Sequence, residues 1–420
     1  MLIQLRYEYF KSFRDDTILD FSATKITEHS NRVVQLGKEK ILPVAAIYGA
    51  NASGKSNVLE AFRFMETYVL ESFAYNDITE KKSKIRKAKY TPFLFDNTTR
   101  EGSSLFEVYF IASEDEGCKT YNYGFTLNQE GIVEEWLNIK SKTAREFKAV
   151  FYRDKNNLDL SGLPKNSQEN IRTVLGKESL IVSYGAMFKI EKLKTVLEWF
   201  YSSNSVNFGD PLENVYLSHM YPNDFAEDKR VQQNVIKYLS SFDSAIQGFD
   251  IEVVKEEEDE ETKVLKIDTL HKIIGTNDTY PISLKDESAG TLKMFALYPI
   301  LEDTLVNGSV LFVDELNARL HPLLVRLIIL SFLNEETNPK HAQLVFTAHD
   351  TWQLANDMLR RDEIWFTDKN EEGVSTLYSL ADFTIEDGSK IRKDENYEKN
   401  YLLGKYGAIP CLKYFDMFRG

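Results

Sequence analysis

The chain has 420 residues, of which 43% are hydrophobic and 28% charged, a balance typical of a soluble globular protein with more than one core. Its formal net charge of −14 argues against a strong, constitutive grip on nucleic acid, although it does not exclude a local basic groove. Two cysteines, Cys118 and Cys411, provide neither a disulfide framework nor a zinc site. No apolar run could span a bilayer and no signal peptide is evident, so we expect a cytoplasmic protein without a membrane part.

The N-terminal part predicts strands on both sides of a Gly-rich turn. Residues 1–22 alternate apolar and polar side chains, which indicates a hairpin or two edge strands. The short apolar run 44–48 predicts a buried strand, and helical spacing of apolar residues predicts a helix over 55–73. Two paired strands are expected at 105–111 and 121–127.

The rest of the chain divides into a mixed middle and an alternating C-terminal part. Residues 146–245 have a mostly helical pattern without repeats, and a hairpin is expected around the acidic run 256–261, which we interpret as a solvated turn. Helices are then expected from about 289, 322 and 352, and strands at 310–313, 343–346 and 363–367. Alternating strands and helices predict a largely parallel sheet covered by helices.

Residues 49–56, GANASGKS, match the phosphate-binding pattern G-x-x-x-x-G-K-[ST] between an expected strand and an expected helix. Gly49 and Gly54 allow a tight turn whose N–H groups face the β-phosphate, and the helix N-terminus adds a favourable dipole. Lys55 is expected to reach the β- and γ-phosphates, and Ser56 to bind Mg²⁺. A Gly-rich turn without a ligand is the alternative, which this context disfavours.

The expected strand 310–313 runs into two carboxylates, Asp314 and Glu315. Asp314 is placed to hold Mg²⁺, directly or through water, and Glu315 to polarise the attacking water. A solvated acidic pair is the simpler interpretation of this pattern alone. The phosphate-binding loop upstream in the same chain favours the functional one.

Two further segments indicate which kind of nucleotide-binding protein this is. Ser288, Gly290 and Thr291 open an expected helix upstream of Asp314, and they combine a hydroxyl, a glycine for close approach and a helix N-terminus. An ordinary helix cap at Ser288 is the alternative. His349 follows the expected strand 343–346, and its order after Asp314 favours a functional over a structural role. It resembles the switch histidine of ABC ATPases, and this resemblance implies a contact with the γ-phosphate.

In this order the motifs resemble the SMC/RecF-type ABC ATPases. The segment 9–13, YFKSF, is similar to their Asn-Phe-Arg-Ser-Phe opening, with Tyr9 and Lys11 in place of Asn and Arg. Lys11 either approaches the nucleotide or is a solvated strand residue. Asn57 also fits this branch, whose loop often reads G-x-N-x-x-G-K-S-N.

More narrowly, the chain resembles the RloA/AbiLii-like ATPases of phage-defence loci. Residues 316–322, LNARLHP, are similar to the family's D-E-L-x-x-x-L-H-P, and 401–410, YLLGKYGAIP, to its closing Y-L-x-G-x-Y-G-A-x-P. Arg319 stands where the family has a small residue facing the partner subunit. The tail either docks a partner or packs on the head, and we favour packing.

The resemblance implies an α/β fold, an ABC-type P-loop NTPase head with two lobes and a mainly helical insertion. The lobes are 1–145 and 246–420, and the insertion is 146–245. The residues expected to bind nucleotide are Gly49, Asn51, Ser53, Gly54, Lys55, Ser56, Asn57 and Lys11. Catalysis is expected from Glu315 and His349, Mg²⁺ binding from Ser56 and Asp314, and the signature in trans from Ser288, Gly290 and Thr291.

The resemblance also implies partners. It predicts a homodimer, or a higher homo-oligomer, whose heads sandwich ATP, acting as a sensor in anti-phage defence that controls a separately encoded effector such as a nuclease or toxin. The alternative is a RecF-like DNA repair or maintenance ATPase, favoured by the basic run 81–89, which could equally be a solvated loop. A transporter domain and a single-chain nuclease are both disfavoured.

Overall fold

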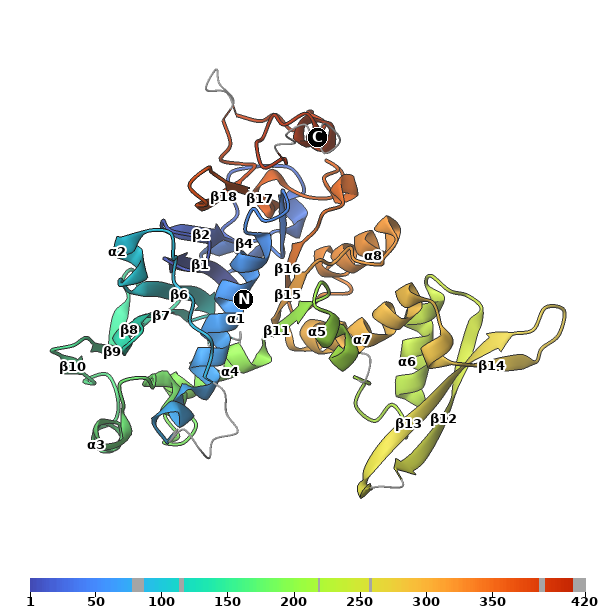
Figure 1. Cartoon of the computed structure of the whole chain (residues 1–420), viewed down its shortest axis with the longest axis horizontal. Helices are drawn as coiled ribbons and strands as arrows, with labels where there is room; N and C mark the ends of the chain where they lie inside the picture. Colours follow the sequence, from blue (N-terminus) through green and yellow to red (C-terminus); the bar gives the residue numbers. More distant parts are fainter. Residues whose placement is uncertain (78–86, 113–116, 218–219, 257–258, 385–389, 411–420) are drawn as a thin grey trace, which may run out of the picture.

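The computed structural model describes residues 1–77, 87–112, 117–217, 220–256, 259–384 and 390–410 (Figure 1). Within these residues the chain forms a six-stranded and a seven-stranded sheet, a three-stranded sheet and a small hairpin. No helix in the described residues is long and apolar enough to cross a bilayer. The basic run 81–89 lies outside the described residues up to position 86, and the acidic run 256–261 does so at positions 257 and 258.

The six-stranded sheet runs in the order β11-β15-β16-β5-β17-β18, and every neighbouring pair is parallel except β17 with β18. Its strands are β5 (Val44–Gly49), β11 (Asn204–Asn207), β15 (Val310–Asp314), β16 (Gln343–Thr347), β17 (Ile364–Lys369) and β18 (Ser375–Ser379). Strands β5, β15 and β16 are buried along their whole length, as near-continuous apolar runs should be in a parallel sheet covered on both faces. The four expected strands of this sheet are therefore confirmed.

Two hydrophobic cores lie on opposite faces of this sheet. Because successive strand residues point to opposite faces, Ala45 and Ile47 enter one core while Val44, Ala46 and Tyr48 enter the other. The first core is shared with the seven-stranded sheet, and the second with the helices of the C-terminal half. The sheet therefore forms the middle layer to which both halves of the chain attach.

The seven-stranded sheet is antiparallel throughout, in the order β10-β9-β8-β7-β6-β1-β2. Its strands are β1 (Leu2–Glu8), β2 (Thr17–Asp20), β6 (Ser104–Ile111), β7 (Thr120–Asn128), β8 (Gly131–Lys140), β9 (Lys148–Arg153) and β10 (Leu158–Asp159). The small hairpin pairs β3 (Val34–Leu36) with β4 (Glu39–Ile41). The expected pairings of residues 1–22 and of β6 with β7 are confirmed.

Helix α1 (Lys55–Glu71) runs between the two large sheets (Figure 1). On one side the Phe62 ring stacks on that of Phe312 of β15, with centroids 4.0 Å apart. On the other side Phe64 packs on Phe106 of β6 at 4.9 Å. Aromatic pairs at these distances add to the stabilisation from buried apolar area. The helix that opens at the phosphate-binding loop is thus fixed to both sheets.

The middle segment 146–245 contributes to both large sheets as well as forming helices. Its helices are α3 (Lys165–Val174), α4 (Glu191–Ser202), α5 (Pro211–Leu217) and α6 (Lys229–Ser240). Strand β9 pairs with β8, so the expected boundary at 145/146 falls inside one sheet, and β11 adds to the edge of the other beside β15. The division into two lobes and an insertion stays a prediction.

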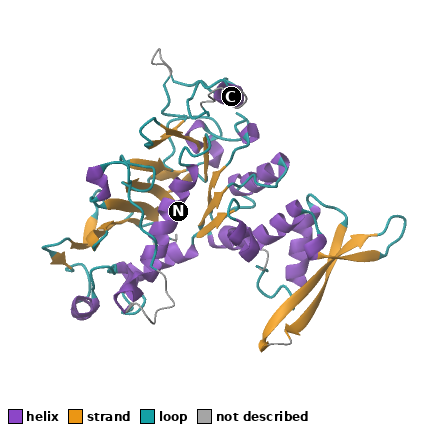
Figure 2. Cartoon of the chain, in the orientation of Figure 1, coloured by secondary structure: helices purple, strands orange, loops and turns teal. Residues whose placement is uncertain are grey.

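The third sheet projects away from the rest of the chain as two long strands and a short one (Figure 2). It consists of β12 (Ile246–Glu256), β13 (Asp259–Lys272) and β14 (Thr279–Ser283). The remaining helices are α2 (Asn97–Arg100), α7 (Ala289–Asn307), α8 (Pro322–Leu333) and α9 (Tyr397–Leu402). A cluster of Phe225, Phe249 and Phe295 joins this sheet to α7.

The helix expected from about residue 352 is wrong. The structure has only a single 3-10 turn there, Thr351–Gln353. Polar side chains draw the following segment away from a helical path: Gln353 donates to the Pro322 carbonyl, and Asn356 donates to the carbonyls of Lys393 and Glu395. Such side-chain bonds to distant backbone compete with helix formation.

The C-terminal segment 401–408 packs against β17 and β18. The Tyr401 ring stacks on Phe366 at 5.3 Å, and Tyr378 Oη donates to the carbonyl of the fully buried Tyr406 at 2.6 Å. Tyr401 Oη also donates to the Ala408 carbonyl at 3.1 Å. These contacts support the packing interpretation of the tail, because its aromatic residues complete the second core.

Replacing Tyr406 with alanine should therefore destabilise the whole head. We expect a loss of about 3–5 kcal/mol in the free energy of unfolding, as for other fully buried aromatic residues, measured by urea denaturation. The matched control is Leu402→Ala in the same segment, whose side chain is exposed and whose loss should change stability by less than about 0.5 kcal/mol. Equal stability of the two variants would contradict the packing role.

Candidate nucleotide site

The loop between β5 and α1 forms a cradle in which only glycine fits at two positions. A Cβ on Gly49 would lie 2.4 Å from the Thr367 carbonyl oxygen, and one on Gly54 would lie 2.7 Å from Ser375 Oγ. Gly54 also has φ +115°, which side-chain-bearing residues rarely adopt. The loop is therefore held closely against β17 and β18, and this shape fits a phosphate group bound by backbone N–H groups.

Lys55, the first residue of α1, folds back over this loop. Its Nζ donates to the carbonyls of Gly49 at 2.9 Å and Ala50 at 3.0 Å, and its side chain is buried. Burial lowers the pKa of the Lys55 ammonium, while the nearby Asp314 and Glu315 carboxylates partly offset that effect. An ammonium group held at the cradle is suited to bind phosphate oxygens.

Hydrogen bonds among hydroxyl and amide side chains of several segments hold the loop in place. Ser53 Oγ lies 2.6 Å from Thr367 Oγ1, and Asn57 Nδ2 donates to Ser12 Oγ at 2.7 Å. Ser375 Oγ donates to the same Ser12 oxygen at 2.8 Å. Asn57 and Ser53, both expected to bind nucleotide, thus support the loop here, whereas Asn51 is exposed on it. Ser12 and Ser375 were not singled out by the sequence.

The carboxylates after β15 are ordered by one threonine of the neighbouring strand. Thr347 Oγ1 donates to Asp314 Oδ1 at 2.5 Å and accepts the Glu315 backbone N–H at 2.8 Å. Asp314 is buried, while the Glu315 side chain is 39% exposed on a residue with φ +55°. Thr347 was not assigned a role in advance. Its position at the end of the adjacent parallel strand is the signal that could have identified it.

Ser56 supplies a hydroxyl and Asp314 a buried carboxylate, both at the edge of the sheet where the parallel strands end. Ser56 lies in the first turn of α1 and Asp314 at the carboxyl end of β15. Hard oxygen donors of this kind suit Mg²⁺ coordinated by one or two protein ligands together with phosphate oxygens and water. The donor set therefore fits the expected metal.

His349 faces Glu315 across the site. Its Nε2 lies 3.9 Å from Glu315 Oε1, and its backbone N–H donates to Asn317 Oδ1 at 3.2 Å. Burial and the charge of Lys55 lower the pKa of the His349 imidazole, and Glu315 and Asp314 only partly oppose them. The net effect favours the neutral form of the ring.

The signature residues form a capped helix start beside the loop 316–321. Ser288 Oγ accepts the Thr291 N–H at 3.1 Å and lies 2.8 Å from Thr291 Oγ1, so Ser288 caps α7 within this chain. A Cβ on Gly290 would lie 3.6 Å from the Arg319 carbonyl oxygen. Arg319 has φ +60°, a strained backbone conformation for a long side chain. The trans contact of the signature residues stays a prediction.

Lys293 links α7 to the same loop, a connection that the sequence did not reveal. Its Nζ donates to the carbonyls of Leu316 at 2.9 Å and Ala318 at 2.6 Å, and it lies 3.7 Å from the centre of the Phe208 ring. Burial lowers the pKa of Lys293 to about 7, with Glu315 opposing and Arg319 reinforcing this shift. The signature helix and the loop after Glu315 are thus one connected unit.

Lys11 is engaged with helix α1 in this structure. It forms an ion pair with Glu60, and its Nζ lies 5.9 Å from the centre of the Phe10 ring. Burial, together with the charge of Lys89, lowers the pKa of Lys11. A contact between Lys11 and a nucleotide stays a prediction.

The glycine cradle, the buried Lys55 and the Asp314–Thr347–Glu315 group at the ends of parallel strands define a P-loop ATPase head. The capped signature helix lies upstream of Asp314, and His349 follows the next strand, which is the order expected for an SMC/ABC-type head. The chain belongs to the family described as "AAA domain, putative AbiEii toxin, Type IV TA system", whose profile matches residues 44–351. The expected α/β P-loop fold class is confirmed, whereas the narrower RloA/AbiLii-like assignment stays a prediction.

Among solved structures, one similar to this chain is described as "Crystal structure of the SmcHead bound to the C-winged helix domain of ScpA". The two share 15% sequence identity with a TM-score of 0.42, and the match covers 90% of this chain and 97% of the other. No curated protein matches the sequence.

Thr347→Val should weaken the binding of Mg²⁺ at the nucleotide site without unfolding the protein. Removing the hydroxyl leaves Asp314 and the Glu315 N–H without their shared partner, and losses of this kind typically weaken metal affinity about 10–100-fold. The measurement is Mg²⁺ titration of ATP binding by fluorescence. Thr347→Ser keeps the hydroxyl and should bind like wild type; equal binding by the valine variant would argue against the ordering role of Thr347.

Lys293 should make stability depend on pH. Its folded pKa of about 7 is below the ordinary 10.5, so between these values the unfolded chain binds the extra proton. The free-energy cost of burying the charged ammonium is fully present below pH 7 and decreases as the pH rises toward 10.5. Relative to Lys293→Met, wild type should therefore gain about 2 kcal/mol between pH 7 and pH 9 in urea unfolding.

The control for this measurement is the exposed Lys285→Met on the approach to the same helix. Its stability difference from wild type should not change over the same pH range. A pH-independent difference for Lys293→Met as well would contradict the burial effect.

Proposed function

We propose that the chain binds Mg²⁺-ATP between two copies of its head and hydrolyses it. The observation that carries this proposal is that Lys55, Asp314, Glu315 and His349 come together at one edge of the parallel sheet. Residues of these types, a cradle lysine, a metal-holding aspartate, a water-polarising glutamate and a γ-phosphate histidine, are what phosphoryl transfer to water needs.

Each group has a defined task in this mechanism. The backbone of the cradle and Lys55 bind the β- and γ-phosphates. Ser56 and Asp314 would hold Mg²⁺, which would neutralise the negative charge that develops during phosphoryl transfer. Glu315 is more than one-third exposed and can orient water for attack on the γ-phosphate, while the neutral His349 beside it can donate a hydrogen bond. Ser288, Gly290 and Thr291 complete the site of the second copy.

We further propose that ATP-driven assembly regulates a separately encoded effector, such as a nuclease or toxin, in anti-phage defence. The support is the family description, which names an AbiEii toxin and a toxin–antitoxin system, together with the resemblance of segments 316–322 and 401–410 to RloA/AbiLii-like ATPases. Control of the effector by ATP suits this task, because a head that assembles only with bound nucleotide has two distinct states, monomeric and assembled.

The DNA-maintenance alternative depends on the basic run 81–89. Of this run the structure describes residues 87–89, where Lys87 is ion-paired with Glu178, and Lys89 lies close enough to Lys11 to lower its pKa. We favour the defence proposal because the family description supports it, whereas the described residues of this run add no observation in favour of DNA binding.

Glu315→Gln should trap an ATP-bound dimer. Without the carboxylate that polarises water, phosphate release should fall at least about a hundredfold, while Lys55 and Asp314 still bind Mg²⁺-ATP. Light scattering should then show a doubling of mass with Mg²⁺-ATP and none without it. Glu335→Gln, in an exposed loop, is the matched control and should behave like wild type.

A variant that binds ATP but stays monomeric would contradict the shared site. Unchanged phosphate release in Glu315→Gln would contradict the role of this carboxylate. The regulatory proposal has its own readout in the same variants: phage plating on cells that express the chain with its neighbouring gene should be reduced by wild type but not by Glu315→Gln.

A further inference from the structure

Gly209 lies where the chain leaves β11 and passes the side chain of Glu315. In the pairing of β11 with β15, Asn207 is opposite Asp314, and the Phe208 N–H donates to the Asp314 carbonyl at 3.1 Å. Gly209 and Glu315 follow directly after this contact. A Cβ placed on Gly209 would lie 2.9 Å from Glu315 Cδ and 3.0 Å from Glu315 Oε1, so the carboxylate occupies the space that a side chain would need.

Glycine at this position provides space rather than an unusual backbone conformation. The φ of Gly209 lies outside the left-handed region, unlike that of Gly49 and Gly54 in the phosphate-binding loop. An alanine could therefore adopt the same backbone. Carbon atoms in van der Waals contact lie about 3.5–4.0 Å apart, so an added methyl group would move either the turn or the carboxylate by about 0.5 Å or more.

The turn that carries Gly209 is held by side-chain hydrogen bonds to its backbone. Asn207 Oδ1 accepts the Gly209 N–H at 2.8 Å. Asn214 Nδ2 donates to the carbonyls of Phe208 and Asp210, both at 2.9 Å. These bonds satisfy backbone groups on both sides of Gly209, so a displacement of the turn would break several of them.

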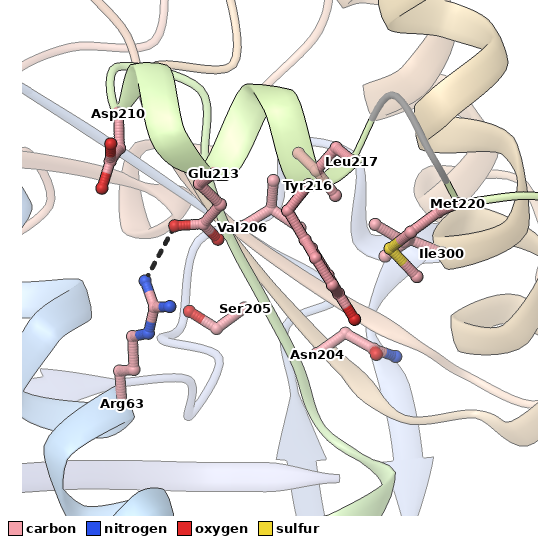
Figure 3. Close-up of a pocket in the computed structure, with 10 residues that line it drawn as sticks. All are labelled: Arg63, Asn204, Ser205, Val206, Asp210, Glu213, Tyr216, Leu217, Met220 and Ile300. Carbon is pink, nitrogen blue, oxygen red and sulfur yellow. Dashed lines mark hydrogen bonds and ion pairs between the residues drawn. The ribbon is translucent and has the colours of Figure 1, made fainter. Parts of the chain in front are cut away.

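An ion pair fastens the same turn to helix α1. Figure 3 shows the Arg63 guanidinium of α1 directed at the Glu213 carboxylate of α5, 3.0 Å away, beside a cavity of about 430 Å³. Glu213 also accepts the Asn207 N–H at 3.1 Å. Because α1 is packed between both large sheets, the turn is connected to the rigid part of the head.

The Glu315 side chain, in contrast, has room to move. It is partly exposed and borders a cavity of about 480 Å³, which Ala318 and Arg319 also line. The Oε1 atom that faces Gly209 also lies 3.9 Å from His349 Nε2. A side chain at position 209 would therefore displace this carboxylate rather than the turn, and would change its distance from His349.

We infer that Gly209 is a positioning residue for ATP hydrolysis, because the absence of a side chain there lets the Glu315 carboxylate lie between the turn after β11 and His349. The inference rests on the proposed role of Glu315 in orienting water, and it involves contacts within one chain only. The three atoms nearest to a Cβ on Gly209 belong to Glu315 and Asn207, and none belongs to the groups proposed to bind Mg²⁺-ATP. Gly209 should therefore affect the hydrolytic step and not nucleotide binding.

Gly209→Ala tests this inference. Its kcat for phosphate release should fall at least about tenfold, because a misplacement of about 1 Å can cost about a hundredfold, while KM and the affinity for ATP change by less than about twofold. The matched control is Gly248→Ala in β12, where a Cβ would lie 3.3 Å from the flexible Leu270 side chain. This control should hydrolyse ATP like wild type.

A double-mutant cycle determines whether Gly209 acts through Glu315. In the Glu315→Gln background, Gly209→Ala should lower the residual rate of phosphate release by less than about twofold, because the carboxylate that the methyl group displaces is already absent. A further loss of the full size there would overturn the positioning role. If Gly209→Ala alone does not fold, adding Glu315→Asp should restore the fold, because the shorter side chain leaves room for the methyl group; failure of that rescue would overturn the contact.

The outcomes separate this inference from the function on which it rests. If Glu315→Gln releases phosphate as fast as wild type, the proposed role of Glu315 is wrong and the inference falls with it. If Glu315→Gln is slow but Gly209→Ala keeps the wild-type kcat, the proposed function stands and the inference is overturned. A raised KM with an unchanged kcat would likewise overturn it, since Gly209 would then serve nucleotide binding.

Discussion

The site depends on the register of four parallel strands. Because β15, β16, β5 and β17 run in the same direction, their carboxyl ends meet at one edge and bring together Asp314, Thr347, Gly49 and Thr367. Thr347 of β16 then donates to Asp314 of β15, and Thr367 of β17 lies within hydrogen-bond distance of Ser53 in the loop after β5. A register shift of one residue in any of these pairings would point the functional side chain toward the opposite face of the sheet.

The sequence predicted the parts of this arrangement that follow from local pattern. Apolar runs, glycines at fixed spacing and paired carboxylates identified β5, α1, β15 and β16, because buried parallel strands and phosphate-binding loops impose strong constraints on residue type. The same patterns placed the motifs in the correct order along the chain. For the tail, packing was favoured over docking of a partner, and in the structure Tyr401 and Tyr406 lie in the second core.

The remaining features depend on contacts between distant segments. Strand β11 has a single buried residue, Val206, so its polar sequence predicts no strand; pairing with β15 creates it. Thr347 and Lys293 look ordinary in the sequence, and their roles arise only because a neighbouring strand and loop present acceptors to them. The expected helix after residue 351 failed for the same reason, since Gln353 and Asn356 bind backbone carbonyls elsewhere.

Backbone strain at two positions affects which amino-acid substitutions would stabilise this protein. Glu315 and Arg319 both sit at positive φ, in conformations that glycine adopts freely and that cost other residues about 1 kcal/mol or more. A screen for thermal tolerance would therefore reward glycine at both positions. At position 315 the gain would remove the carboxylate of the site, so selection for robustness and selection for turnover pull this residue in opposite directions.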